Sequence, residues 1–184
     1  SRYGVVGGNG SGKSTLMRIL IGEMEPESGE VFLPSDIKLG LLKQDQFRYE
    51  NTPILDVVLM GRPLLWKALA EKEAISQTEH INEFIGKKLA DLETTIADND
   101  GYLAEAEATE LLSGLGIEPK LVSQPLSILS GGYKLRVLLA QCLFSQPDFL
   151  MLDEPTNHLD INSIQWLESY LQNFKGATFV ISHD

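Results

Sequence analysis

The chain has 184 residues, of which 43% are hydrophobic, and its formal net charge is −11. This length and composition suit one globular domain with a proper core, while the negative charge excludes binding of nucleic acid over the whole surface and leaves room only for local contacts. No apolar run approaches the roughly eighteen residues that a membrane span needs and no signal segment opens the chain, so we expect a soluble protein.

The first predicted strand, residues 3–6, leads into a glycine-rich stretch that matches the P-loop pattern of Gly, four residues, and Gly-Lys-Ser. A helix is predicted next, over residues 12–21. Glycines let the backbone turn its N–H groups inward, where they and the positive helix end hold a polyphosphate. We expect Lys13 to reach the β and γ phosphates and the Ser14 hydroxyl to ligate Mg²⁺. The residues assigned to the nucleotide here are Gly7, Asn9, Gly10, Ser11, Gly12, Lys13, Ser14 and Thr15.

Short elements are predicted after the P-loop helix. Residues 25–29 form a turn because they combine proline, serine and glycine, and residues 30–33 and 37–42 are predicted to be short strands. Thr52 with Pro53 then begins a helix that Gly61 closes. This part of the chain therefore extends the α/β pattern that the P-loop begins.

Residues 62–101 differ from the rest of the chain because they are charged and strongly helical. Leu65 and Leu69 lie four residues apart in a first helix that runs to about residue 75. A second helix carries a single apolar stripe, formed by Ile81, Ile85, Leu89, Leu92 and Ile96. Charges of alternating sign on its other side support an exposed helix. We predict two antiparallel helices; the alternative is an ordinary part of a helical subdomain.

A helix over residues 102–115 and a polar loop over residues 120–126 precede the sequence Leu-Ser-Gly-Gly at residues 129–132. The helix that follows is apolar on nearly every side and must be buried, so its single cysteine, Cys142, is a small core residue. No internal disulfide can form, which fits a reducing, cytoplasmic compartment. Glycines that expose N–H groups at a helix N-terminus make a second anion site. Since one nucleotide does not need two such sites, we expect the second to serve a partner domain in a head-to-tail dimer.

Residues 149–152 form an apolar strand that delivers Asp153 and Glu154 to the carboxyl end of a sheet. A helix over residues 161–174 and a strand over residues 178–181 follow, and this alternation predicts an α/β fold with a parallel sheet. We expect Asp153 to hold Mg²⁺ through water and Glu154 to be the general base. A solvated acidic pair at a strand end is the alternative for these two residues taken alone.

Six features follow one another along the chain: the P-loop, Gln44, residues 129–132, residues 149–154, residues 157–160 and His183. Their order resembles an ABC-type ATPase domain, which implies a P-loop NTPase fold with a mainly parallel sheet and a helical subdomain. The resemblance places Gln44 near Mg²⁺ and the attacking water, and His183 on the γ-phosphate. It also assigns Ser130, Gly131 and Gly132 to the partner's γ-phosphate, and Asp160 to the dimer seam. Tyr133 departs from the glutamine that is commonest after this motif.

Residues 153–160 read Asp-Glu-Pro-Thr-Asn-His-Leu-Asp, which resembles the ABC-F proteins within that superfamily. By this resemblance residues 62–101 are an inserted helical arm between core segments 1–60 and 118–184. Residues 41–47, 100–106 and 134–141 are most similar to the bacterial YbiT-type members.

ABC-F membership implies that this chain is the first of two ATPase domains in one polypeptide. ATP closes the two domains head to tail and hydrolysis reopens them, and the arm touches ribosomal protein, rRNA or tRNA on the ribosome. The candidate RNA contacts on the arm are Lys67, Lys72, Lys87 and Lys88. The alternative for each is a solvated helix lysine balanced by nearby acidic residues.

Other functions stay open. An ATPase subunit of an ABC transporter is one, although the 62–101 insertion and the Asn157-His158 pair count against it. A DNA-associated ABC ATPase is a second, with a basic coiled-coil tail as its mark. A regulatory module that barely turns over is a third, and the presence of Glu154 and His183 disfavours it.

Overall fold

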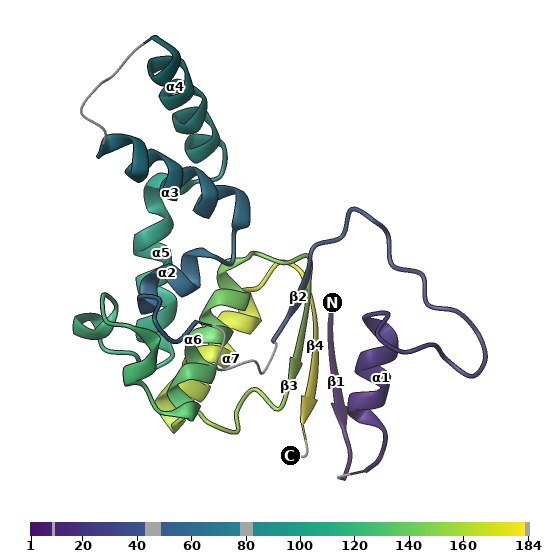
Figure 1. The fold of residues 1–184 in the computed structure, drawn as a ribbon. Helices are drawn as coiled ribbons and strands as arrows, with labels where there is room; N and C mark the ends of the chain where they lie inside the picture. Colours follow the sequence, from purple (N-terminus) through teal and green to yellow (C-terminus); the bar gives the residue numbers. More distant parts are fainter. Residues whose placement is uncertain (9, 43–48, 78–82, 183–184) are drawn as a thin grey trace.

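A parallel sheet forms the centre of the computed structural model, which describes residues 1–8, 10–42, 49–77 and 83–182. The four described strands lie in the order β1-β4-β3-β2, and every pairing is parallel. Their bounds are Arg2–Val6 for β1, Leu39–Leu41 for β2, Phe149–Asp153 for β3 and Ala177–Ser182 for β4. The predicted parallel α/β architecture is confirmed (Figure 1).

The strand register brings distant segments to one edge of the sheet. Val6 pairs with Ser182, and Asp153 pairs with Ile181. The P-loop that follows β1, the acidic pair at the end of β3 and the end of β4 therefore share the carboxyl edge. Parallel α/β sheets bind ligands at this edge.

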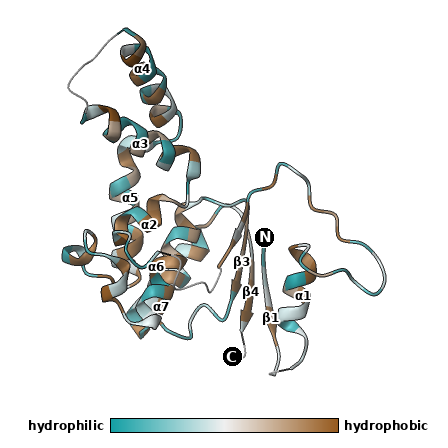
Figure 2. Cartoon of the chain, in the orientation of Figure 1, coloured by the Kyte–Doolittle hydropathy of each residue, from teal (hydrophilic) through white to brown (hydrophobic). Residues whose placement is uncertain are grey.

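Helices cover the sheet on both faces. Helix α1, Lys13–Leu20, lies on one face, and α6, Gly131–Phe144, and α7, Ile161–Asn173, lie on the other (Figure 1). Met17 of α1 packs with Met151, Phe179 and Ile181, whereas Leu150 and Leu152 point to the opposite face and join the larger core. Successive strand residues point to opposite faces, so β3, which is hydrophobic except for Asp153 at its end (Figure 2), is buried on both faces.

The larger core is built around α6. It collects α2, Ile54–Leu59, and α5, Ala104–Gly114, and its fully buried members include Leu112, Leu143 and Phe144. The prediction that this helix is buried, and Cys142 with it, is confirmed. Burial raises the pKa of the Cys142 thiol to about 12.

Two helices project from the core, α3 at Pro63–Ser76 and α4 at Glu83–Asp98 (Figure 1). Lys72 forms an ion pair with Glu93 at 2.6 Å, and Lys88 forms one with Glu71 at 2.5 Å. Two adjacent residues of α3 thus pair with residues 88 and 93 of α4, so the two helices pack against each other. We call α3 and α4 the hairpin. Within the described ranges, no helix is both long enough and apolar enough to cross a lipid bilayer.

Two predictions in the first half of the chain are corrected. Residues 30–33 do not form a strand, and Phe32 is 85% exposed. A strand needs a neighbour to accept its hydrogen bonds, and in the described part of the chain nothing pairs with this segment. The strand predicted over residues 37–42 is shorter, and only Leu39–Leu41 pairs with β3.

The helix predicted over residues 102–115 consists of a 3₁₀ turn, Gly101–Leu103, followed by α5. Two further 3₁₀ turns, Pro119–Leu121 and Leu126–Ile128, overlap the two ends of the polar loop predicted over residues 120–126. These short turns connect α5 to the start of α6.

Candidate functional site

Glycine-rich residues lie between β1 and α1, and residues 7, 8 and 10–12 of this segment are described by the structure. Gly10 and Gly12 have φ angles of 82° and 89°, a left-handed conformation that glycine adopts without steric cost. The backbone N–H of Ser11 donates to the Gly8 carbonyl at 3.2 Å, which closes the turn. Helix α1 begins at Lys13, so the unpaired N–H groups of its first turn adjoin the loop. This is the backbone arrangement that holds phosphate groups.

Two side chains of the first turn of α1 have defined partners. The Lys13 ammonium donates to the carbonyl oxygens of Gly7 and of Gly8, the latter at 3.1 Å. The Ser14 hydroxyl donates to Oδ2 of Asp153 at 3.3 Å, across 139 residues of sequence. A hydroxyl and a carboxylate oxygen are ligands that suit Mg²⁺, so the pair fits the metal site predicted for it. Thr15 is exposed on the same turn.

Glu154 follows β3 in a strained backbone conformation. Its φ angle is 48°, in the left-handed region that residues other than glycine rarely adopt. The Glu154 N–H donates to the Ile181 carbonyl at 2.9 Å, and the Glu154 carbonyl accepts from the Asn157 N–H at 3.2 Å. Backbone strain of this kind persists only where neighbouring structure holds it, and it clusters at functional sites. Strand β4 thus fixes the Glu154 backbone beside Asp153.

The turn at residues 130–132, which we call the signature turn, lies at the N-terminus of the buried helix α6. Ser130 is the N-cap residue and has extended backbone angles of −66° and 162°. Its hydroxyl makes no capping hydrogen bond, and Ser130 and Gly131 are exposed. The first N–H groups of a helix have no partner within it, so this turn presents donors of the kind the sequence predicted.

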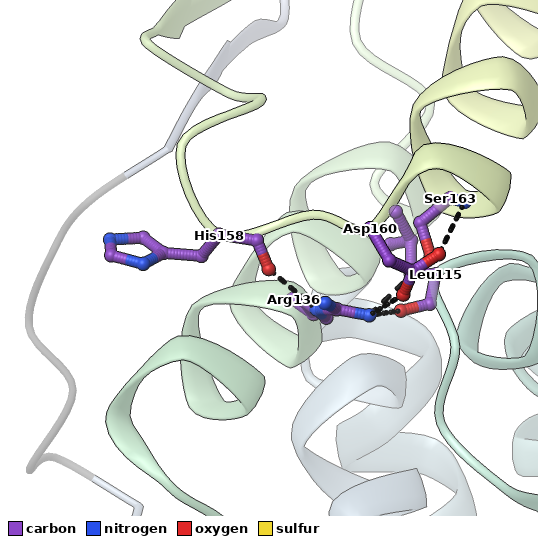
Figure 3. A network of polar contacts seen from close by, with 5 residues as sticks. All are labelled: Leu115, Arg136, His158, Asp160 and Ser163. Carbon is purple, nitrogen blue, oxygen red and sulfur yellow. Dashed lines mark hydrogen bonds and ion pairs between the residues drawn. The ribbon is translucent and has the colours of Figure 1, made fainter.

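Asp160 is held by two elements at once (Figure 3). It is the N-cap of α7, where its Oδ1 accepts from the Ser163 N–H at 3.0 Å. Its Oδ2 accepts from Nη1 of Arg136, on α6, at 2.8 Å. The Ser163 hydrogen bond, followed by the Arg136 hydrogen bond, lowers the pKa of Asp160 to about 2.

Arg136 was not among the residues predicted from sequence. Only 7% of it is exposed, and it lies in a helix that is otherwise mostly apolar. A buried charge needs partners, so an arginine in a helix predicted to be buried was the available signal. Its partners come from two other segments, Leu115 and residues 158–163, and the sequence alone does not show that they meet.

Some of the predicted site residues contact one another in the structure, and others are not among the residues that it describes. Ser14 and Asp153 are in contact and Glu154 adjoins them. A cavity of about 40 Å³ is lined by Asp153, Glu154, Arg136 and His158, among others, and so reaches from the acidic pair to α6. Asn9, Gln44 and His183 lie outside the described residues, although β4 ends at Ser182, between β1 and β3.

A larger cavity, of about 680 Å³, lies elsewhere in the molecule. Its walls come from α5, α7 and the segments that precede β3 and β4, including Pro147, Asp148 and Gly176. It therefore lies at the edge of the sheet opposite the P-loop. None of the predicted site residues lines it, so volume alone does not identify the nucleotide site here.

Comparisons with known proteins identify relatives that bind ATP by name. The family model described as "ABC transporter" matches residues 1–157. The chain is 49% identical, over all of its length and 35% of the relative's, to a "Probable ATP-binding protein YbiT" of Escherichia coli O157:H7. It is 37% identical to rat "ATP-binding cassette sub-family F member 3", covering all of this chain and 25% of that one.

A further relative is the "Energy-dependent translational throttle protein EttA" of Mycobacterium tuberculosis, with 34% identity over all of this chain and 33% of that protein. The chain thus spans about a third of the length of the curated relatives it matches. Among solved structures, an ATP-binding subunit of an ABC transporter has a TM-score of 0.66 over 99% of this chain and 68% of that one. At 20% identity this likeness concerns the fold alone.

Proposed function

The chain belongs to the ABC transporter family of ATP-binding domains, and on that premise we propose that it is the first ATPase domain of a cytoplasmic ABC-F translation factor that acts on the ribosome. The observation that carries the ATPase part is the hydrogen bond between Ser14 and Asp153 at 3.3 Å. It joins the end of the phosphate loop to the end of the strand that delivers Glu154. Phosphoryl-transfer sites need this juxtaposition of phosphate loop, metal ligands and base.

Each side chain then has a defined task. The loop amides bind the phosphates. The Lys13 ammonium leaves the carbonyls of Gly7 and Gly8 and binds the β- and γ-phosphates instead. Ser14 and Gln44, with Asp153 through water, would hold Mg²⁺, which would neutralise phosphate charge. Glu154 accepts the proton of the attacking water, a contribution of about 10²–10⁴ in rate. Gln44 and His183 orient the water and the γ-phosphate.

The signature turn serves a nucleotide held by a second ABC domain of the same polypeptide. Its exposed Ser130 and Gly131 support this assignment because the Ser130 hydroxyl accepts no capping hydrogen bond from the N–H groups of the first turn of α6. Asp160 crosses the seam between the two domains. The two nucleotides bind the closed pair better than the open pair, so ATP shifts the population toward closure and hydrolysis reverses it. Relatives three times as long as this chain have room for a second domain.

The ribosome is the partner that the relatives favour. The Mycobacterium tuberculosis relative is named as a translational throttle, and the hairpin projects from the core as an accessible arm would (Figure 1). In this division, residues 62–101 are the arm, and residues 1–60 and 118–184 form the core with its helical subdomain. The arm contacts rRNA or tRNA locally, which the net charge of −11 permits.

The proposal is tested with the full-length protein carrying Glu154→Gln and the matching change in its second domain. This variant binds ATP without hydrolysing it, so we expect it to pellet with ribosomes through a sucrose cushion when ATP is present and to stay in the supernatant without ATP. Lys13→Ala, which loses the phosphate contact, is the matched control and should not pellet in either condition.

Absence of pelleting by a variant that still binds ATP would contradict the ribosomal role while leaving the ATPase in place. Recovery of that variant with membranes would then favour a transporter subunit. Recovery on DNA would favour a DNA-associated ATPase.

A further inference from the structure

Arg136 binds partners from two segments that are far apart in sequence, Leu115 and residues 158–163 (Figure 3). Its Nε donates to the His158 carbonyl at 2.8 Å, and its Nη1 donates to Asp160 at 2.8 Å and to the Leu115 carbonyl at 3.1 Å. The Ser163 hydroxyl lies 3.4 Å from the same nitrogen. Hydrogen bonds to charged groups in buried positions are among the stronger ones. Arg136 therefore ties α6 to the segment that follows Glu154.

Gly116 makes room for this contact. It has a φ angle of 81°, and a Cβ placed there would lie 2.7 Å from Nη1 of Arg136 and 3.4 Å from Oδ2 of Asp160. Any larger residue at this position would push against the guanidinium and would also strain the backbone. The chain thus has a side-chain-free position where arginine and aspartate meet.

The same segment also lies close to the signature turn. A Cβ on Gly132 would lie 3.5 Å from Cβ of His158 and 3.6 Å from its Nδ1, so the His158 side chain lies about one methyl group away from Gly132. Tyr133, the next residue, has its ring centroid 4.5 Å from the Arg136 guanidinium, a distance suited to a cation–π contact. Tyr133 therefore packs on Arg136, and Gly132 lies near the segment that Arg136 binds.

Arg136 also reaches toward the acidic pair. It lines the cavity of about 40 Å³ that is also lined by Asp153, Glu154, Asn157 and His158. A cavity this small leaves little space for independent movement of its walls. A shift of Arg136 must therefore be passed to the backbone between Glu154 and Asp160, or to α6.

From these contacts we propose that Arg136, with Tyr133 stacked on it, is a positioning residue that couples the signature turn to the Glu154–Asp160 segment. Engagement of the signature turn by the partner domain's nucleotide is thereby transmitted to the base that acts on this domain's own nucleotide. This inference rests on the two-site ATPase proposed above. Arg136 touches neither nucleotide in this scheme; it sets where Glu154 and Asp160 stand.

The chain contains a matched control for Arg136. Arg62 is 8% exposed, pairs with Glu107 at 2.6 Å, donates to the Phe144 carbonyl at 2.8 Å and stacks on the Phe144 ring at 4.0 Å. It thus has the same burial and the same kinds of partner, but it joins α5 and α6 away from the carboxyl edge. Arg62→Lys should match Arg136→Lys in its cost to stability.

The test compares Arg136→Lys, Arg62→Lys and Tyr133→Ala in the full-length protein. Lysine keeps the charge but cannot reproduce the forked contacts of arginine. Because a small misplacement of a catalytic group is costly, we expect Arg136→Lys to lower kcat about 10- to 100-fold. KM for ATP should stay within about twofold, the pattern of an interaction that acts on the transition state. Arg62→Lys should leave kcat unchanged. The kcat of Tyr133→Ala should lie between those of the two arginine variants, and Tyr133→Phe should have the wild-type kcat.

Amide hydrogen exchange without nucleotide gives a second readout that does not depend on turnover. Arg136→Lys should raise exchange in residues 129–133 and 156–160 together, whereas Arg62→Lys should raise it in neither. Equal loss of kcat in both arginine variants, or exchange confined to one of the two segments, would overturn the coupling. A wild-type protein without ATPase activity would contradict the proposed function instead, and the exchange result would still decide the coupling.

Discussion

Asp160 does two things with its two carboxylate oxygens. One accepts the Ser163 N–H and caps α7, and the other accepts the Arg136 guanidinium. Both interactions favour the charged form, which is why the pKa of this exposed carboxyl falls to about 2. A residue assigned from sequence to a dimer seam thus also holds its own domain together.

This arrangement predicts how stability depends on pH. The pKa of Asp160 is lower in the folded chain than its ordinary value near 4, so its ion pair stabilises the fold above about pH 4 and that stabilisation is lost as pH falls toward 2. Asp160→Asn keeps an N-cap acceptor but removes the charge. We expect the urea midpoint of the wild type to exceed that of the variant at pH 6 and the difference to shrink by pH 3. A difference that is the same at both pH values would contradict the role of the charge.

At the scale of elements, close approach of α5 and α7 depends on a glycine. A Cβ on Gly114 would lie 2.0 Å from Cε2 of Trp166, so the indole packs directly on the α5 backbone. Trp166 in turn stacks with Tyr170 at 5.4 Å. The two helices meet where α5 has no side chain.

Two glycine-to-alanine changes separate packing from helix propensity. Gly114→Ala should destabilise the fold by about 1–3 kcal/mol because the added methyl overlaps Trp166. Gly86 lies in α4, and apart from its neighbours in the same helix no atom of the described residues lies within 4 Å of its Cβ position, so Gly86→Ala should stabilise the fold by up to about 1 kcal/mol. Urea unfolding of both variants measures the two effects. Stabilisation by Gly114→Ala would show that α7 can move away at little cost.

The hairpin divides the four lysines named from sequence into two kinds. Lys72 and Lys88 pair with Glu93 and Glu71 across the hairpin, where solvent screens such exposed pairs. Lys67 and Lys87 are exposed, and neither forms an ion pair among the residues that the structure describes. If the hairpin contacts RNA, this second pair is better suited to it.

The corresponding test uses two double variants of equal charge. Lys67→Gln with Lys87→Gln should weaken ATP-dependent pelleting with ribosomes severalfold and leave the unfolding temperature unchanged, because phosphate contacts are lost. Lys72→Gln with Lys88→Gln should lower the unfolding temperature slightly and affect pelleting less. Equal effects on pelleting would mean that only the total charge of the hairpin matters.

At the scale of the whole molecule, the parallel sheet gathers the P-loop, the acidic pair and the end of β4 at one edge. The signature turn belongs to α6 and is connected to that edge through Arg136 and the segment it binds. A domain built in this way contains half of each of two sites under the proposed function.

The isolated chain should therefore bind ATP but hydrolyse it slowly. Without the partner's signature donors, turnover should fall by about 10²–10³ from that of the full-length protein, the usual effect of losing such a donor. Phosphate release measured at several protein concentrations tests this. Brisk turnover that does not depend on concentration would contradict the two-site arrangement, whereas turnover that rises with concentration would indicate pairing of copies.

The features determined by sequence alone are those whose signals are local. The P-loop, the apolar strand before Asp153 and the two glycines at the start of α6 each depend on neighbouring residues, and the structure has all three. The resemblance to the ABC family is confirmed as well. The roles assigned to the individual site residues, Gln44 and His183 among them, stay predictions.

Tertiary structure alone decided what depends on partners distant in sequence. Residues 30–33 have the composition of a strand but lack a neighbouring strand, so no ladder forms. For Arg136, the apolar helix around it predicts burial from sequence alone. Only the folded chain supplies the partners that make this burial tolerable, which are the carbonyls of Leu115 and His158 and the carboxylate of Asp160. A local pattern specifies what a segment can form, whereas long-range contacts decide whether a strand is paired or a buried charge is satisfied.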